Sequence, residues 1–349
     1  MKKLNLKPIR TYAVKFGCDP EFFIEIENKV TGSEKIIPEK GIENTSKFHS
    51  ASIHNGTKIK RDGVQCEINT RPMACRAHVH NEIVAAFMTL KKHLGDAKVI
   101  SNQVIKMDKK VLDSLSKEAR KFGCAPSKNA YTETTNKINV SASRYLYRSA
   151  GGHIHIGKSM DYEDHKTKKI FSDIPRLVRM FDIVVGCTGT LLDRDIWAKE
   201  RRKVYGKAGD YRLPTHGFEY RTLSNFWLND HILQSLMMGL CRTACEMKMS
   251  GWDEHIFKAT EELDIETIIN KNDINGAIEV FNIMEQFYNL LPNYDHFPLN
   301  QSTTNPFRYL FMHGFKGRGY GNLIDYWCGR KEGHIGGFNF EIAKLKGDV

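Results

Sequence analysis

The sequence predicts an α+β protein with a β-sheet whose charged, concave face carries the site and whose other face is covered by helices. Four short stretches support this prediction, because each places acidic, amide, imidazole or cationic side chains at positions i and i+2: 17–22, 67–71, 151–157 and 219–221. Side chains two residues apart on a strand point to the same face of a sheet. A face so rich in ionisable groups is a poor core, because unpaired charges are costly to bury, but it can bind metal ions and phosphates.

The central stretch is Gly-Gly-His-Ile-His-Ile-Gly at 151–157. As a strand, it places His153 and His155 on one face and Ile154 and Ile156 on the other. Two imidazoles side by side need polar partners if they are buried. The flanking glycines fit the ends of a strand, or a place where a ligand comes close to the backbone.

The first half of the chain is predicted to contain two regions of strand. Residues 10–27 have strand character, and Pro20 cannot donate a ladder hydrogen bond, so this strand is expected at a sheet edge or with a bulge. Residues 58–71 return to strand character and supply Asp62 and Glu67. Because these two carboxylates are close in sequence, Asp62 competes with Glu67 for the same role.

Helical patterns begin at Arg76, where apolar residues recur at spacings of three and four. This helix is expected on the back of the sheet, with His78 and His80 solvated. Asp161–Asp193 is predicted as a helix interrupted at Pro175. The other expected elements are a strand at Val99–Ile105, helices at Asp108–Lys121, His231–Met249 and Asn275–Leu290, and a loop over 126–143.

The chain is expected to form one catalytic domain over 1–349, with its motifs within 12–230. The rest, 231–349, is predicted to be a helical and glycine-rich C-terminal portion of that domain. Its glycine-rich turns at 313–321 lack the spacing of a P-loop but are predicted to close over a substrate.

The segment 199–212 carries six cationic residues among fourteen, set around Gly206 and Gly209. A run of this kind is usually a solvated loop. It lies in sequence between the histidine strand and the strand at 219–221, so it can reach the same face. We therefore favour a phosphate-binding role, since the planar guanidinium of arginine can pair with two phosphate oxygens at once.

Composition restricts the class of partner. The chain has 52 lysines and arginines against 41 acidic residues, a formal net charge of +11, which suggests an anionic partner such as a nucleotide. Nucleic acid is not favoured, because no RNP-type motif or basic tail is present. The eight cysteines form no Cys-x-x-Cys pair, and no apolar run approaches ~20 residues, so we expect a cytoplasmic protein with reduced thiols and no membrane segment.

The candidate ligands are mainly carboxylates: Glu21, Glu67 and Glu219, with one histidine of the 153/155 pair. Hard oxygen ligands favour Mg²⁺ or Mn²⁺ over zinc. Several carboxylates and arginines together suit a nucleoside triphosphate with bound Mg²⁺, because the metal bridges phosphate oxygens and arginine neutralises charge during transfer.

Five motifs in order resemble the carboxylate–amine ligases of the glutamine synthetase and glutamate–cysteine ligase fold, and most closely the tailed-phage type 2 COOH·NH2 ligases. They are Gly-x-Asp-x-Glu-Phe, Asp-Gly-x-x-x-Glu-Ile-Asn, Gly-Gly-His-Ile-His-Ile-Gly, Arg-Arg-x-x-Tyr-Gly-Lys-Ala-Gly-Asp-Tyr-Arg and Gly-Phe-Glu-Tyr-Arg-Thr-Leu. Each motif alone is weak, but their order over residues 12–230 is fairly specific.

This resemblance implies a curved antiparallel sheet and an ATP-dependent enzyme that activates a carboxylate as an acyl phosphate, which an amine then converts to an amide. It implies metal binding by Glu21, Glu67 and Glu219 with Asp19, and metal or phosphate binding by His153 or His155. It also implies phosphate contacts from Arg212 and Arg221, and positioning of nucleotide or acidic substrate by Arg201, Arg202, Tyr205 and Lys207. Relatives often have Glu where this chain has Asp19, and the shorter side chain of Asp reaches less far toward a metal.

The resemblance further implies a carboxylate and an amine substrate, such as a peptide, a protein side chain or a cell-wall component, in the host cytoplasm if the protein is phage-encoded. The oligomeric state stays open: enzymes of the glutamine synthetase fold often assemble, which is compatible with a homo-oligomer. Two alternatives stay open: a zinc-dependent hydrolase that uses the His-x-His strand, and a non-catalytic binding protein with the same fold.

Overall fold

The computed structural model describes residues 6–9, 14–43, 57–122, 126–136, 145–158, 170–293, 297–300, 304–315 and 322–329. Within them, the largest element is an eleven-stranded sheet in the order β3-β4-β5-β1-β11-β13-β12-β8-β9, with β2 and β6 also paired to β1. All of its strand pairs are antiparallel. The predicted α+β class is confirmed.

The strands of this sheet are β1 (Val14–Ile26), β2 (Lys29–Thr31), β3 (Ile42–Glu43), β4 (Lys58–Asp62), β5 (Gln65–Asn69), β6 (Lys98–Ile100), β8 (Ser127–Asn129), β9 (Thr135–Asn136), β11 (Gly152–Lys158), β12 (Asp210–Arg212) and β13 (Gly217–Tyr220). A separate pair joins β7 (Val104–Lys106) to β10 (Tyr147–Ser149). The helices are α1 (Arg76–Leu94), α2 (Lys109–Ser114), α4 (Ile174–Phe181), α5 (Cys187–Leu192), α6 (Ala198–Val204), α7 (His231–Met249), α8 (Asp253–Ala259), α9 (Ile265–Asn270), α10 (Ile274–Tyr288), α11 (Thr304–His313) and α12 (Leu323–Cys328). Short helical turns occupy Ser33–Lys35, Asp182–Gly186 and Asn225–Asn229.

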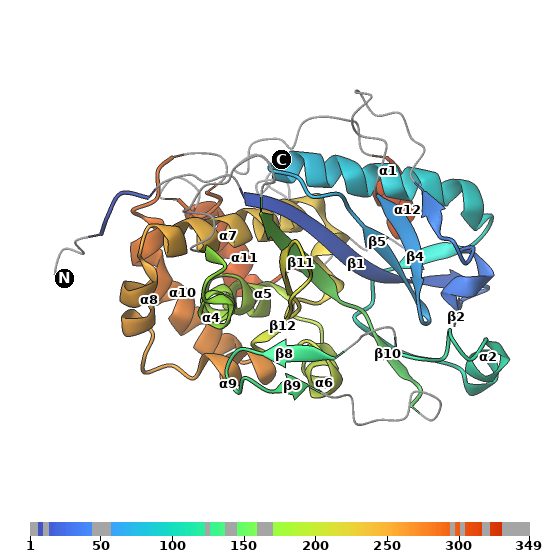
Figure 1. The fold of residues 1–349 in the computed structure, drawn as a ribbon. Coiled ribbons are helices and arrows are strands. Elements are labelled where there is room, and N and C mark those ends of the chain that lie inside the picture. Colours follow the sequence, from blue (N-terminus) through green and yellow to red (C-terminus); the bar gives the residue numbers. More distant parts are fainter. Residues whose placement is uncertain are drawn as a thin grey trace.

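Strand β1 lies inside the sheet, between β5 and β11 (Figure 1). The expectation of an edge strand is therefore wrong. Pro20 is tolerated because it is the last residue of β1 in register with β11, opposite Gly152, and the pairing with β5 begins at Glu21. The N–H that Pro20 lacks thus falls where β1 ends its pairing with β11 and begins its pairing with β5.

The face opposite the charged residues packs against helices, as predicted. Phe22 of β1 is buried, and its ring lies 5.5 Å from that of Phe87 on α1. Phe218 of β13 lies 5.3 Å from Phe181 of α4. Ile154 and Ile156 of β11 belong to the same hydrophobic core. This packing fixes which face of β1, β11 and β13 is left for polar side chains.

Two helical predictions need correction. His80 on α1 is buried rather than solvated, because its ring packs 5.3 Å from that of Trp327. Pro175 lies in the first turn of α4, where its missing N–H leaves no bond unmade, so it helps to start a helix instead of interrupting one. The first part of that predicted helix, 161–169, lies outside the described residues.

The other predicted elements differ mainly in their bounds. Helices α1, α7 and α10 are confirmed, α2 is shorter than expected, and the strand predicted at Val99–Ile105 divides into β6 and β7. The predicted loop over 126–143 contains β8 and β9, which extend the sheet. The glycine-rich turns at 316–321 fall outside the described residues. Among the helices of the described residues, none is long and apolar enough to cross a membrane.

Candidate active site

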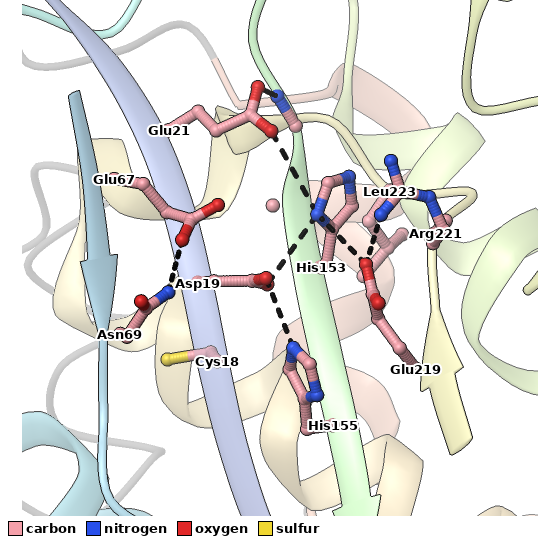
Figure 2. A network of polar contacts seen from close by, with 12 residues as sticks. Cys18, Asp19, Glu21, Glu67, Asn69, His153, His155, Glu219, Arg221 and Leu223 are labelled. Atoms are coloured by element: carbon pink, nitrogen blue, oxygen red, sulfur yellow. Dashed lines mark hydrogen bonds and ion pairs between the residues drawn. The ribbon is translucent and has the colours of Figure 1, made fainter. Parts of the chain in front are cut away.

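The sheet register aligns the predicted acidic and imidazole residues in adjacent rows. Asp19 of β1 is opposite His153 of β11, and Glu21 is opposite Glu67 of β5. One row further, His155 is opposite Glu219 of β13. Because each strand alternates its side chains with period two, these groups lie on one face of the sheet. Figure 2 shows Asp19, His153 and Glu219 directed toward one another from three strands.

A first potential metal site is formed by Asp19, His153 and Glu219, whose ligand atoms lie within 4.8 Å of one another. Nδ1 of His153 lies 3.5 Å from Oδ1 of Asp19, 3.4 Å from Oε1 of Glu219 and 3.9 Å from Oε1 of Glu21. Within the described part of the chain, neither Nδ1 of His153 nor Oδ1 of Asp19 makes a hydrogen bond, although both atoms are buried. Buried polar atoms of this kind fit a bound cation.

The second group consists of Glu21, Asp62 and Glu67, again with ligand atoms within 4.8 Å. Burial, followed by the charge of Asp62, raises the pKa of Glu21 to about 8. Burial and the neighbouring carboxylates Asp19, Asp62 and Glu21 raise the pKa of Glu67 well above its usual value. Asn69 donates a hydrogen bond to Glu67. Carboxylates that repel one another in this way favour a cation between them.

The sequence makes Asp62 a competitor for the role of Glu67, but the structure brings both to the site. The signal lay in the sequence: glycine at the first position of a two-residue turn is typical of a β-hairpin, and Gly63-Val64 joins β4 to β5. Gly63 has the positive φ of 64° that such a turn requires. The hairpin brings the end of β4 beside the Glu67 strand.

The two histidines have different surroundings, which identifies the better ligand. His155 uses both ring nitrogens: Nε2 lies 3.0 Å from Oδ2 of Asp19, and Nδ1 lies 3.1 Å from Nε2 of His216. His153 keeps Nδ1 toward the carboxylates. Burial and the charge of Arg221 lower the pKa of His153 to about 4, so its ring is neutral at pH 7 and can ligate a metal.

Tyr205 connects the two acidic groups. Its hydroxyl donates to Oε1 of Glu21 at 3.0 Å and contacts Nε2 of His153. This contact at Nε2 orients the imidazole so that Nδ1 faces the first group. The guanidinium groups of Arg201 and Arg221 lie 4.7 and 5.2 Å from the centre of the tyrosine ring. Tyr205 therefore acts on the site by holding ligands rather than by an exposed hydroxyl.

The cationic residues divide into two sets. Arg221 pairs with Glu219, and Nη1 of Arg212 lies 3.7 Å from Oε2 of the same carboxylate, so both reach the site. Arg201 is buried and donates to the backbone carbonyls of Ala150, Thr222 and Leu223.

Two further predicted nucleotide contacts are Arg202 and Lys207. Arg202 is buried and donates to Oδ1 of Asn272, and the side chain of Lys207 is exposed. The predicted basic loop is in part the helix α6, which turns Arg201 and Arg202 into the protein. The structure therefore does not support nucleotide binding by these two arginines, whose guanidinium groups already have protein partners.

A pocket of about 620 Å³ opens beside the acidic groups. Asp19, Glu67 and Glu219 line one part, and Lys15, Lys60 and Arg212 bring cationic side chains to its wall. The volume is within the range of small-molecule sites, roughly 300–1,000 Å³. Phosphates near the acidic groups would meet Arg212, and metal ions would meet the carboxylates.

Residues 136–250 match the family model described as phage phiEco32-like COOH.NH2 ligase-type 2. This match over part of the chain supports the predicted family. The matched segment contains β11, β12, β13 and α6, and thus His153, Glu219, Arg221 and Tyr205. It indicates an enzyme of the carboxylate–amine ligase kind. No curated protein matches the chain.

Proposed function

We propose that the protein is an ATP- and Mg²⁺-dependent carboxylate–amine ligase that forms an amide bond through an acyl phosphate. The observation that carries this proposal is the convergence of Asp19, Glu219 and Nδ1 of His153 beside two arginines. The histidine, the glutamate and both arginines lie in the segment that matches a ligase family. Carboxylates with one imidazole suit Mg²⁺ or Mn²⁺. The proposal keeps the glutamine synthetase-like curvature of the sheet as an expectation.

The residues present fit divalent cations in both acidic groups. Asp19, His153 and Glu219 would hold one, and Glu21, Asp62 and Glu67 would hold another. A bound Mg²⁺ supplies charge neutralisation of the phosphate oxygens and orients them. The buried oxygen of Asp19 and the nitrogen of His153 that lack hydrogen bonds are the structural reason for this assignment.

The arginines support phosphoryl transfer to the substrate. A carboxylate oxygen of the substrate attacks the γ-phosphorus of ATP, the bond from that phosphorus to the bridging oxygen breaks, and ADP leaves. Arg212 and Arg221 stabilise the negative charge on the transferred group, because a guanidinium can pair with two oxygens. Arg221 is held in place by Glu219 and by the ring of Tyr205.

Amide formation completes the reaction. The nitrogen of the amine attacks the acyl carbon, the carbon–oxygen bond to phosphate breaks, and inorganic phosphate and a proton are released. The carboxylate and amine are proposed to belong to a peptide, a protein side chain or a cell-wall component. No group of this chain is required as a covalent nucleophile, which agrees with a site built of carboxylates, histidines and arginines.

The first test is a thermal-shift titration of the whole chain with a non-hydrolysable ATP analogue, Mg²⁺, Zn²⁺ and a chelator. A ligand that binds only the native state raises its stability, so we expect stabilisation that requires analogue and Mg²⁺ together. A screen of carboxylates and amines for ADP release follows. Stabilisation by Zn²⁺ alone would instead support the hydrolase, and no response to any ligand would support a non-catalytic binding protein.

A further inference from the structure

Within the described residues, neither backbone conformation nor steric crowding requires the two glycines in the middle of the sheet. Gly17 of β1 and Gly157 of β11 lie outside the positive-φ region. A Cβ added to Gly17 would meet its nearest neighbour, the carbonyl oxygen of Thr70, at 3.5 Å, and one added to Gly157 would meet that of His216 at 3.4 Å. These are ordinary contacts, so the fold can accept alanine at both positions.

The other glycines of the described residues differ from these two. Each either has a positive φ or would bring a Cβ within 3.0 Å of another atom. Gly217, for example, has φ +157°, and its Cβ would meet the carbonyl oxygen of Ile156 at 2.0 Å. Glycine inside a strand is unfavourable by roughly 0.5–1 kcal/mol relative to alanine. A requirement from outside the protein would explain its presence at 17 and 157.

Both glycines belong to the wall of the active-site pocket. Gly17 lies two residues before Asp19 and opposite His155, and Gly157 lies opposite Lys15. Gly217 is the next residue in that row. The glycines therefore leave an area of bare backbone on the face that carries the acidic groups, and a flat ligand can approach a backbone of this kind closely.

The position of this area indicates which part of the ligand it receives. Lys15 and Asp19 are four residues apart, about 13 Å along a strand. This is the span from metal-bound phosphates to the base of a nucleotide. In the other direction along β1, Phe23 is fully buried in a second hydrophobic cluster, which closes that end. His155 is opposite Gly17, and His216 is the nearest neighbour of a Cβ added at Gly157, so these two histidines, with ring centroids 5.2 Å apart, border the bare area.

We infer that Gly17 and Gly157 form the floor of a subsite on which the base and ribose of the nucleotide lie flat. This inference rests on the proposed function, because it assumes that the phosphates are held at the acidic groups. It adds a steric requirement: the floor must carry no side chain. The polar contacts to the phosphates are independent of this requirement.

The test compares a ligand that has a base with one that lacks it. Calorimetric titrations with Mg²⁺ and either a non-hydrolysable ATP analogue or inorganic tripolyphosphate are made on the wild-type protein, Gly157→Ala and Gly17→Ala. We expect each alanine substitution to lower the affinity for the ATP analogue by at least about tenfold, because a methyl group in a filled site costs binding energy. Tripolyphosphate should bind all three proteins within about twofold, since it does not reach the floor.

Two controls show whether the variants are intact. Both should unfold at the same or a higher urea concentration than the wild type, since alanine restricts the unfolded chain more than glycine does. Both should also keep the wild-type affinity for Mn²⁺. Equal affinity of all three proteins for the analogue would overturn the inference and leave the proposed function standing. The same conclusion would follow if the variants lost affinity equally for the analogue and for tripolyphosphate. A wild-type protein that binds neither ligand would instead refute the proposed function.

Discussion

Replacement of Glu21 by Gln should stabilise the metal-free protein at alkaline pH. The Glu21 carboxylate is 2 % exposed, and burial followed by the charge of Asp62 raises its pKa from 4.5 to about 8. The native state therefore binds a proton more tightly than the unfolded chain, and the free energy of unfolding falls as pH rises from about 4.5 to 8. A rise of this size corresponds to about 5 kcal/mol at pH 8 and above.

Glutamine removes the charge and can keep an oxygen for the backbone N–H of Gly151, which donates to Oε2 of Glu21 at 2.7 Å. In chelator at pH 8.5, urea unfolding followed by tryptophan fluorescence should show Glu21→Gln to be more stable than the wild type by up to about 5 kcal/mol. At pH 5 most of the difference should vanish. With Mg²⁺ the order should reverse, because the wild type gains more from the cation.

A matched control is Glu82→Gln, which alters a buried carboxylate outside the site that pairs with Arg71 at 2.7 Å. Loss of one partner of such a pair is destabilising, so this variant should lose stability with and without Mg²⁺. If Glu21→Gln is less stable than the wild type in chelator at pH 8.5, crowding of carboxylates does not destabilise the metal-free site, and the reasoning is refuted.

Four further variants test single contacts. Tyr205→Phe should lower the affinity for Mn²⁺ by about 10–100-fold in a calorimetric titration, because the hydroxyl orients His153 and Glu21; unchanged affinity would exclude that role. Arg201→Lys should lower the urea midpoint but leave the KM for ATP unchanged, since this guanidinium binds backbone carbonyls. Arg221→Ala should cost about 3–5 kcal/mol of stability, measured by urea unfolding, as well as activity, because its buried partner Glu219 is left unpaired; Glu219→Gln is then the cleaner test of turnover. Burial raises the pKa of Asp182 to about 7, so this carboxyl should contribute to a fall in stability between about pH 4 and 7, and the fall should be smaller in Asp182→Asn; an unchanged slope would contradict the assignment.

Alternation along strands was sufficient to predict which residues share the charged face. Asp19 and Glu21, like His153 and His155, are two residues apart, and the antiparallel register aligns them. The choice between the two histidines could not be made from the sequence, because both point the same way. It depends on partners distant in the chain: Tyr205 at Nε2 of His153, and His216 at Nδ1 of His155.

The basic segment shows where charge alone fails as a guide. A run of cations predicts a solvated or ligand-binding surface, but a helix has an inner side as well as an outer one. Arg201 is placed on the inner side of α6, where backbone carbonyls from the ends of β10 and β13 need donors. Arg212 follows on β12 and reaches Glu219. Arg201 and Arg212 have different roles because the first lies on helix α6 and the second on strand β12. The sequence pattern did not reveal where the helix ends and the strand begins.

The two acidic groups are best regarded as one unit. Asp19 and Glu21 belong to different groups but to the same strand, and the hydroxyl of Tyr205 joins Glu21 to His153. A cation in either group lowers the repulsion that raises the pKa values of Glu21 and Glu67, so it also makes the other group easier to ionise. Ionised carboxylates are the form that binds metal, and occupancy of the two groups should therefore be coupled through these shared side chains. The same crowding that weakens the metal-free fold at high pH would thus favour binding of the two proposed cations together.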